Sequence, residues 1–355
     1  MIWLLLACNP DDPGTDTAAP TVTVDELAAP GPYAVGFRVE EVAYTDPAGE
    51  PRTLRLALWW PTDATSGVEA RYFFGSQAAG PGVYADAVVA AGPFPLAVFS
   101  HGHQGYAENS SFLMAHLATH GWIVAAPDHT GNTALDGSDR TTAIYYQRPA
   151  DLSAVLDHLD AAADPVAQAI DAGGAVAIGH SFGGYSLFGL AGGSWDEAAL
   201  ACPDPTTDFC STMTPATADL FRTGFHDDRV IAALPMAPGD FGLYGAGLAD
   251  VAVPVLLMGG ALDPGGDGQP FWDVLAADDR HRYVRIDGAG HQSFTDFSGI
   301  LEDFDGLIDP AEGFRIVDVY ALAWARAARG DTSVLPILSG DVPVAGSAHL
   351  EPTSP

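Results

Sequence analysis

Short apolar runs alternate with longer segments of helical periodicity along this chain. Runs of four to eight apolar residues predict buried strands, whereas apolar residues three and four positions apart predict helices. This alternation is typical of an α/β fold, in which helices cover both faces of a mostly parallel sheet. We expect eight strands, at residues 35–45, 53–60, 95–100, 122–126, 175–179, 230–234, 253–258 and 282–286. We expect the main helices at residues 110–120, 150–163, 182–191 and 314–328.

The same pattern divides the chain into regions. Residues 31–340 form the expected catalytic domain, and residues 341–355 form a C-terminal tail. Within the domain, residues 193–228 lack strand character, which predicts a short cap-like insertion. Residues 9–30 are rich in Thr, Ala and Pro and show no periodicity, which predicts a flexible tether.

The first eight residues form a short apolar run that ends at Cys8. This run resembles the lipobox of bacterial lipoproteins, and the resemblance implies that Cys8 carries a lipid anchor. No basic residue precedes the run, and the run is shorter than an ordinary signal sequence. The alternatives are a shortened signal peptide and a cytoplasmic protein. We expect an exported protein, either a membrane-anchored lipoprotein or a periplasmic or extracellular protein.

Charge excludes several partners. The chain has 14 basic residues, all of them Arg, and 46 acidic residues, which gives a net charge of −32. Such a surface repels nucleic acid and anionic lipid headgroups. No apolar run reaches the roughly 18 residues of a membrane-spanning helix. We therefore expect no nucleic-acid partner and no integral membrane protein.

Two further cysteines, Cys202 and Cys210, lie in a short loop of turn-forming residues. Two cysteines that close a short loop outside the cytoplasm predict a disulfide. The alternative is a pair of free thiols in a reducing compartment. The loop offers too few ligands for a metal ion.

The most informative motif is Gly179-His180-Ser181-Phe182-Gly183, a G-x-S-x-G sequence. It follows an expected strand and opens an expected helix, which is the setting of a nucleophile elbow. The start of that helix offers backbone N–H groups to a developing oxyanion. The alternative, a phosphate-binding turn, would have more glycines before the helix and a lysine. The motif therefore predicts Ser181 as a nucleophile.

A serine nucleophile needs a base and an acid. His291 lies in a Gly-rich loop after the last expected strand, which is the position of the base. Asp263 follows the strand at residues 253–258 and is the expected acid, with Asp240 and Asp267 as competitors. The segment from Asp263 to Gly268 lacks the alternating ligands and final Glu of a calcium loop.

Other polar and aromatic residues complete the expected site. The turn at residues 100–105 follows an early strand, so we expect the backbone N–H groups of His103 and Phe182 to form an oxyanion hole. The expected pocket residues are Gln104, Tyr106, Trp195 and Phe294.

The remaining histidines suggest little chemistry. His116 and His120 lie one helical turn apart and could bind a metal, but such a pair is more often found on a partly solvated helix face. We interpret His129 and His281 as structural. We expect no metal and no organic cofactor.

The ordered motifs resemble the α/β-hydrolase superfamily over about residues 31–330. They resemble more closely the platelet-activating-factor acetylhydrolases, the dienelactone-hydrolase-like esterases and the bacterial polyester hydrolases. The residues that carry the resemblance are Gly31–Gly36, Phe99–Gly102, His120–His129, Arg148–Leu152, Gly179–Gly184 and His291–Phe297.

The chain departs from each of these families at one position or more. Dienelactone hydrolases use a cysteine where this chain has Ser181. The acetylhydrolases take their acid after the strand that here ends Leu234-Pro235-Met236, which favours Asp263 in this chain. The polyester hydrolases have Met and Trp where this chain has Phe182 and Gly239.

The resemblance and the motifs together predict a serine carboxylic ester hydrolase that forms an acyl-enzyme. Short-chain acyl, lipid-like or polyester-type esters are the expected substrates, and a monomer is the expected state. The alternatives are a cutinase-like polyester hydrolase or lipase, a thioesterase or amidase with the same triad, and an inactive binding module.

Overall fold

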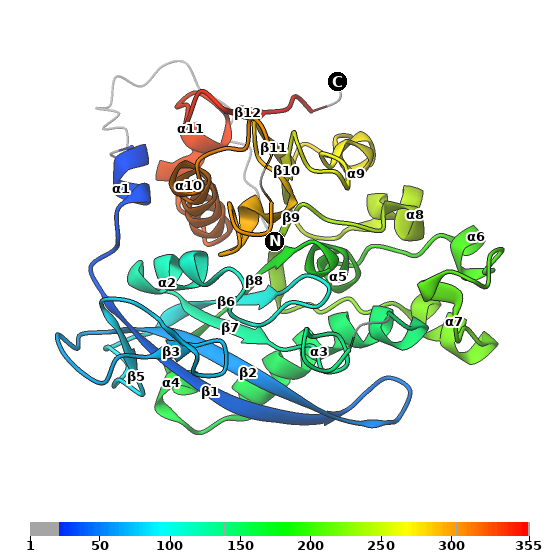
Figure 1. Cartoon of the computed structure of the whole chain (residues 1–355), viewed down its shortest axis with the longest axis horizontal. Coiled ribbons are helices and arrows are strands. Elements are labelled where there is room, and N and C mark those ends of the chain that lie inside the picture. The colour runs from blue at the N-terminus through cyan, green and yellow to red at the C-terminus, as the bar shows by residue number, and fades with distance from the viewer. Residues whose placement is uncertain (1–20, 138–139, 303, 354–355) are drawn as a thin grey trace, which may run out of the picture.

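The structure is a computed structural model that describes residues 21–137, 140–302 and 304–353 (Figure 1). The signal-like segment and Cys8 lie outside the described residues. Within these ranges, one sheet contains ten strands in the order β12-β11-β10-β9-β8-β6-β7-β2-β1-β5. A separate hairpin pairs β3 with β4.

The strands of the sheet are β1 Ala34–Thr45, β2 Pro51–Thr62, β5 Val83–Ala85, β6 Phe94–Ser100, β7 Ile123–Pro127, β8 Ile170–His180, β9 Val230–Met236, β10 Leu256–Gly260, β11 Arg282–Ile286 and β12 Ala348–Leu350. The hairpin consists of β3 Arg71–Tyr72 and β4 Gln77–Ala78. Strands β6 to β11 run parallel to one another, whereas β2 is antiparallel to both β1 and β7. The mostly parallel sheet is confirmed.

The expected number of eight strands is too low. The two extra strands of the sheet, β5 and β12, have three residues each and lie at its two edges. A three-residue strand is too short to show a periodicity in the sequence. β12 pairs antiparallel with β11, so the expected C-terminal tail adds an edge strand to the sheet.

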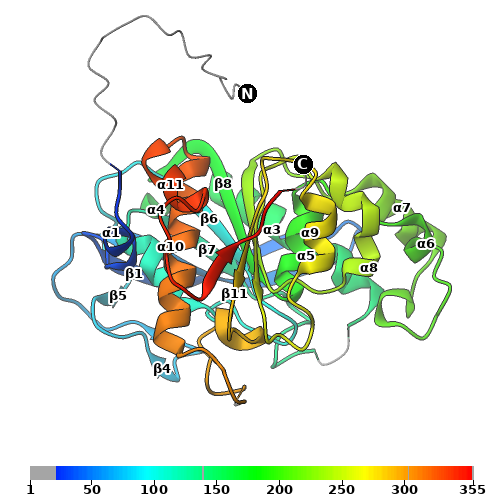
Figure 2. The ribbon, with the colours of Figure 1, turned by 90° about the horizontal axis from the view of Figure 1, so that it is seen from above.

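Helices cover both faces of the sheet, as the sequence predicts (Figure 2). Buried residues of α1, α2, α10 and α11 form the core on one face, and those of α3, α5 and α9 form the core on the other. The helices are α1 Val24–Ala28, α2 Ser111–Thr119, α3 Thr142–Ala161, α4 Pro165–Gln168, α5 Phe182–Leu190, α6 Glu197–Leu200, α7 Pro215–Thr223, α8 Phe241–Tyr244, α9 Gln269–Leu275, α10 Pro310–Ala328 and α11 Leu335–Leu338. Short 3₁₀ helices are η1 Asp208–Cys210, η2 Gly245–Asp250, η3 His291–Phe294 and η4 Thr332–Val334.

Helix α3 begins eight residues earlier than the sequence predicts, because Pro149 lies inside the helix rather than before it. Proline has no N–H group, so the carbonyl of Tyr145 loses its usual partner within the helix. The hydroxyl of Tyr185 donates to that carbonyl at 3.4 Å. This contact from α5 gives the carbonyl of Tyr145 a partner in place of the missing N–H group.

The expected tether at residues 9–30 is corrected at its C-terminal end, where α1 forms. Thr23 and Glu26 make a reciprocal capping box, which satisfies N–H groups at the start of the helix. Leu27 is fully buried in the core shared by α2 and α10. Local capping and one buried leucine therefore fix residues that show no periodicity.

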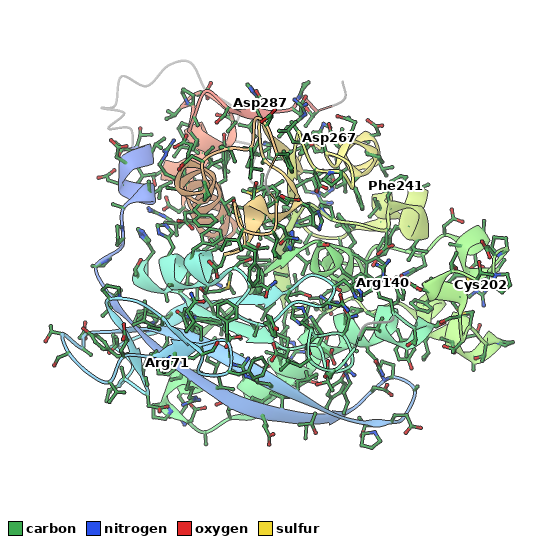
Figure 3. All side chains as sticks on the ribbon, viewed as in Figure 1. Arg71, Arg140, Cys202, Phe241, Asp267 and Asp287 are labelled. Atoms are coloured by element: carbon green, nitrogen blue, oxygen red, sulfur yellow. A yellow bond between two sulfur atoms is a disulfide. The ribbon has the colours of Figure 1, made fainter. Side chains whose placement is uncertain are left out.

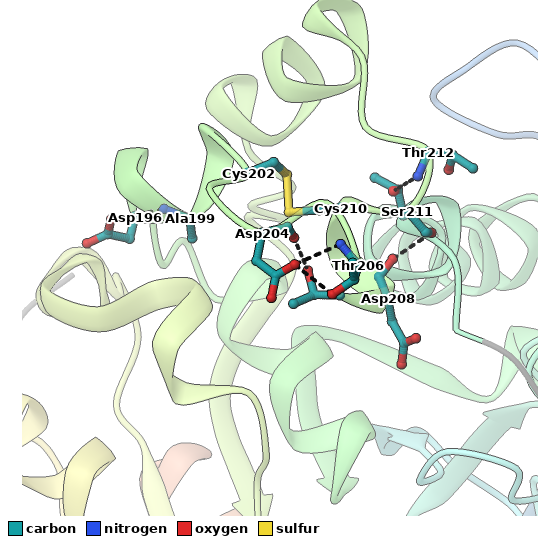
Figure 4. Close-up of a disulfide and its surroundings, with 11 residues drawn as sticks. Asp196, Ala199, Cys202, Asp204, Thr206, Asp208, Cys210, Ser211 and Thr212 are labelled. Carbon is teal, nitrogen blue, oxygen red and sulfur yellow. Dashed lines mark hydrogen bonds between the residues drawn. A yellow bond between two sulfur atoms is a disulfide. The ribbon is translucent and has the colours of Figure 1, made fainter.

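Residues 193–228, which we expect to form a cap-like insertion, contain α6, η1 and α7, and no strand among these fully described residues. A disulfide joins Cys202 to Cys210 (Figure 4). Phe209, next to Cys210, is buried, and its ring lies 5.1 Å from that of Tyr145 in α3. The disulfide therefore closes a loop whose aromatic residue anchors the insertion to the body of the protein.

Replacement of both Cys202 and Cys210 by alanine is expected to lower the free energy of unfolding by about 2–3 kcal/mol, because the cross-link limits the entropy of a short unfolded loop. Denaturant titration of the oxidised parent and of the double variant measures this difference. A reducing agent should destabilise the parent by a similar amount and leave the variant unchanged. Equal stability of the oxidised and reduced parent would contradict this role.

Candidate active site

Ser181 lies in the tight turn between β8 and α5, at the carboxyl end of the central strand. Its backbone has φ 56° and ψ −118°, a conformation that residues with a side chain rarely adopt. Its N–H donates to the carbonyl of Met236 on the neighbouring strand at 2.9 Å. The strained turn is the geometry of a nucleophile elbow.

Two glycines of the motif are required by close approach of the backbone. A Cβ atom on Gly183 would lie 1.9 Å from the carbonyl oxygen of Ser100. A Cβ atom on Gly179 would lie 2.7 Å from the carbonyl carbon of Gly183. The absence of a side chain at Gly183 therefore lets the turn pack against the end of β6, and its absence at Gly179 lets the start of α5 pack against β8.

His291 begins η3, in the loop after β11, and its side chain reaches Ser181. Its Nδ1 lies 2.8 Å from Asp263 Oδ2, and its Nε2 lies 2.9 Å from Ser181 Oγ. The Asp263 carboxylate accepts a hydrogen bond from the Nδ1–H group, so Nε2 presents its lone pair to the serine hydroxyl. The structure thus brings together the three residues that the sequence singled out.

Asp263 lies just after β10 and is held in place by the local backbone. Its Oδ1 accepts the N–H of Gly265 at 2.7 Å, and its side chain is almost completely buried. This turn directs the other oxygen, Oδ2, at the imidazole of His291.

The two competing aspartates pair with arginines instead. Asp240 Oδ2 accepts from Arg140 at 2.8 Å, and Asp267 Oδ2 from Arg285 at 3.3 Å. Figure 3 shows Asp267 near α9 and Arg140 near α3. Neither carboxylate is hydrogen-bonded to His291.

Glu302, which no sequence motif indicates, supports η3. Its two carboxylate oxygens accept the N–H groups of His291 at 3.0 Å and Gln292 at 2.8 Å. These N–H groups are at the start of a helical turn and have no partner within it. Glu302 therefore fixes the backbone that carries the imidazole.

His180, directly before the serine, supports the same histidine. Its Nε2 donates to the carbonyl oxygen of His291 at 2.8 Å, and the two rings are 4.8 Å apart. Burial lowers the pKa of His180 to about 3, so its ring stays neutral. A neutral ring adds no positive charge beside His291.

The turn expected to form the oxyanion hole lies against Ser181. A Cβ atom on Gly102, the residue before His103, would lie 3.2 Å from Ser181 Cβ. Gln104 has φ 54°, and its N–H donates to the carbonyl of Asn132 at 3.1 Å. Phe182 is the first residue of α5, where an N–H has no partner within the helix.

Two of the four expected pocket residues lie at the surface near this turn. Gln104 is exposed, and Tyr106 is half-buried with its ring against those of Phe73 and Phe74. The other two expectations are wrong. Trp195 is 5% exposed and donates to the hydroxyl of Tyr185, and Phe294 is fully buried.

The remaining histidines have structural contacts. His116 and His120 donate to the carbonyls of Leu27 and Ala29, and so hold α1 against α2. His129 bridges Ser100 and Asp151, and His281 accepts the N–H of Val255. Among residues 21–137, 140–302 and 304–353, no group of three His, Cys, Asp or Glu side chains is arranged to hold a metal ion.

Comparison with known proteins agrees with this architecture. The family model for chlorophyllase matches residues 82–212, a range that contains Ser181 and the turn at residues 100–105. No curated protein matches the chain. With the sheet topology, the match shows that the chain has the α/β-hydrolase fold, and it supports an ester hydrolase in general. No helix in the described part of the chain is both long and apolar enough to cross a membrane.

Proposed function

We propose that this α/β-hydrolase is a serine carboxylic ester hydrolase that acts through Ser181, His291 and Asp263. The observation that carries the proposal is the continuous hydrogen-bonded chain from Asp263 through His291 to Ser181 Oγ. A serine is a weak nucleophile unless an adjacent base accepts its proton. The order of serine, acid and histidine along the chain is that of the α/β-hydrolases.

The reaction follows from this geometry. Ser181 Oγ bonds to the ester carbonyl carbon while its proton passes to His291 Nε2. The carbonyl π electrons move to the oxygen, which the N–H groups of His103 and Phe182 would stabilise. The tetrahedral species collapses, the C–O bond to the alcohol breaks, and the alcohol takes the proton from His291. Water then cleaves the acyl-enzyme by the same steps.

The surroundings of the site favour an uncharged ester. An aromatic cluster of Phe73, Phe74, Tyr106 and Phe297 borders the turn at residues 100–105. Two further apolar side chains, Leu262 and Phe304, are exposed by about 40% beside the loops of the acid and base. These apolar side chains would receive the acyl or alcohol part of the substrate.

Charge also disfavours an anionic substrate. The guanidinium of Arg140, 5.0 Å from the Phe182 ring, already pairs with Asp240 and Asp208, so its charge is offset. The chain's net charge of −32 repels an approaching carboxylate.

The disulfide supports a location outside the reducing cytoplasm, and we propose that the protein is exported.

A panel of esters tests this function. We expect turnover of neutral p-nitrophenyl acetate and butyrate, and at least about 10-fold lower kcat/KM for the hemisuccinate, whose carboxylate is repelled. An octanoate, a polyester film, a thioester and an anilide extend the panel to lipase, polyester hydrolase, thioesterase and amidase activity. Faster turnover of the hemisuccinate would contradict the proposed substrate class. Turnover of none of these compounds would favour an inactive binding module.

A further inference from the structure

Arg148 is a fully buried arginine on α3, directly behind the turn at residues 100–105. Its guanidinium donates to the carbonyl oxygen of His101, to Asn132 Oδ1 at 2.8 Å and to Ser186 Oγ at 3.1 Å. Within the described part of the chain, its hydrogen-bond partners are all neutral. A buried charge without a bonded carboxylate lowers the stability of the fold, so a well-packed apolar side chain would be more stable at this position.

The first connection runs from Arg148 through Asn132 to the oxyanion turn. Arg148 holds Oδ1 of Asn132, which leaves the Nδ2 group to donate to His103 Nδ1 at 2.8 Å. The backbone carbonyl of Asn132 accepts the N–H of Gln104. Because Gln104 has a positive φ, this turn needs such support to keep its conformation.

The second connection runs from Arg148 to Phe182. The guanidinium carbon lies 4.7 Å from the centre of the Phe182 ring, within the range of a cation–π contact. Ser186, which accepts from Arg148, donates its hydroxyl proton to the carbonyl of Phe182 at 2.8 Å. Arg148 therefore contacts the backbone of the oxyanion turn directly, and reaches the backbone of Phe182 through Ser186.

The charge of Arg148 persists in this setting. Burial lowers the pKa of Arg148 to about 9, so the guanidinium is still protonated at neutral pH. The nearby carboxylate of Asp151 is hydrogen-bonded to Arg52, Tyr44 and His129 rather than to Arg148. The positive charge is therefore directed at the carbonyl and amide groups of the turn.

We propose that Arg148 is a positioning residue that holds the N–H groups of His103 and Phe182 at the distance an oxyanion requires. This inference rests on the proposed function, since it concerns the transition state of the same ester cleavage. Arg148 acts through His101, Asn132 and the Phe182 ring, and does not itself touch the substrate. Its loss should raise the energy of the tetrahedral oxyanion and leave ground-state binding of the ester unchanged.

The test compares Arg148→Met and Arg148→Lys with the parent, using p-nitrophenyl butyrate. Complete reaction with a fluorophosphonate first counts the active sites in each preparation. A trifluoromethyl ketone then reports on the oxyanion: Ser181 Oγ bonds to its carbonyl carbon, His291 takes the proton, and the ketone oxygen becomes an anion. Arg52→Met is the matched control, because Arg52 bonds Asp151 in the same buried network without contacting the turn.

We expect Arg148→Met to lower kcat per titrated site by about 10²-fold, with KM within about threefold, as for the loss of one oxyanion donor. Affinity for the trifluoromethyl ketone should fall in parallel, and the pH profile should keep its shape because the His291–Asp263 pair is intact. Arg148→Lys should recover only part of kcat, since an ammonium cannot make the same set of bonds. Arg52→Met should lower the melting temperature but keep kcat per site.

An unchanged kcat per titrated site in Arg148→Met would overturn the inference and leave the proposed function intact. A parent that neither reacts with the fluorophosphonate nor cleaves the ester would refute the function and the inference together. If Arg148→Met does not fold, Asn132→Ala cuts the first connection with a smaller volume change. The same parallel loss of kcat and of trifluoromethyl ketone affinity is expected there, and its absence would overturn the inference.

Discussion

Ser181→Ala is expected to lower kcat for p-nitrophenyl esters by at least about 10⁴-fold, because it removes the atom that forms the acyl-enzyme. The alanine keeps the Cβ atom, so the elbow should still form. Loss of the hydrogen bond between Ser181 and His291 should change the melting temperature by only a few degrees. Steady-state kinetics on the purified variant, with circular dichroism to check its fold, measures both effects.

The oxyanion donors remain in this variant, so a small residual activity over the uncatalysed reaction is expected. Turnover as fast as that of the parent would mean that another residue is the nucleophile. If Ser181→Ala is inactive because it does not fold, His291→Ala tests the mechanism instead, since it removes the base and keeps the elbow. That variant should lose activity to a similar extent.

The second large effect concerns the acid. Asp263→Asn is expected to lower kcat by about 10³–10⁴-fold, because an amide in place of the carboxylate favours the wrong tautomer of His291. The variant keeps the size of the side chain and its bond to Gly265 N–H through the amide oxygen. Kinetics at several pH values separates the loss of the base from a change in substrate binding.

Asp240→Asn is the matched control, since Asp240 pairs with Arg140 rather than with His291. We expect its kcat to stay within about 10-fold of the parent value. A large loss of kcat in Asp240→Asn, together with a mild effect in Asp263→Asn, would mean that Asp240 is the acid of the triad. That result would contradict the hydrogen bond between His291 Nδ1 and Asp263 Oδ2.

Much of the fold could be predicted because its central parallel strands are buried on both faces. Such strands are continuous apolar runs, and all eight strands expected from the sequence are present, β11 with the same bounds. Elements that depend on edge pairing or on helix capping were not predicted. The edge strands β5 and β12 are too short to show a pattern, and α1 depends on the capping box of Thr23 and Glu26.

Local motifs also explain why Ser181, Asp263 and His291 could be singled out. Each lies in a glycine-containing loop that follows a strand, and parallel strands bring these loops to one edge of the sheet. Glu302 and Arg148 could not be found in this way. Their contacts with His291 and His101 join segments that no sequence pattern connects.

The pocket was the least predictable part of the site. An aromatic residue near a motif can lie in the core or at the surface, and the sequence does not distinguish the two. Trp195 and Phe294 are in the core, whereas Phe73 and Phe74 come from an irregular turn after β3 and lie against Tyr106. Both have positive φ values, which a sequence reading would not assign to phenylalanine.

The most direct measurement of the central claim is peptide mapping by mass spectrometry after reaction with a fluorophosphonate. The reagent bonds covalently to an activated serine and releases fluoride, so it reports the nucleophile itself. We predict one equivalent of adduct on Ser181 in the parent, none in Ser181→Ala, and much slower labelling in His291→Ala. An adduct on a different residue, or no adduct on an enzyme that cleaves p-nitrophenyl acetate, would contradict the assignment of Ser181.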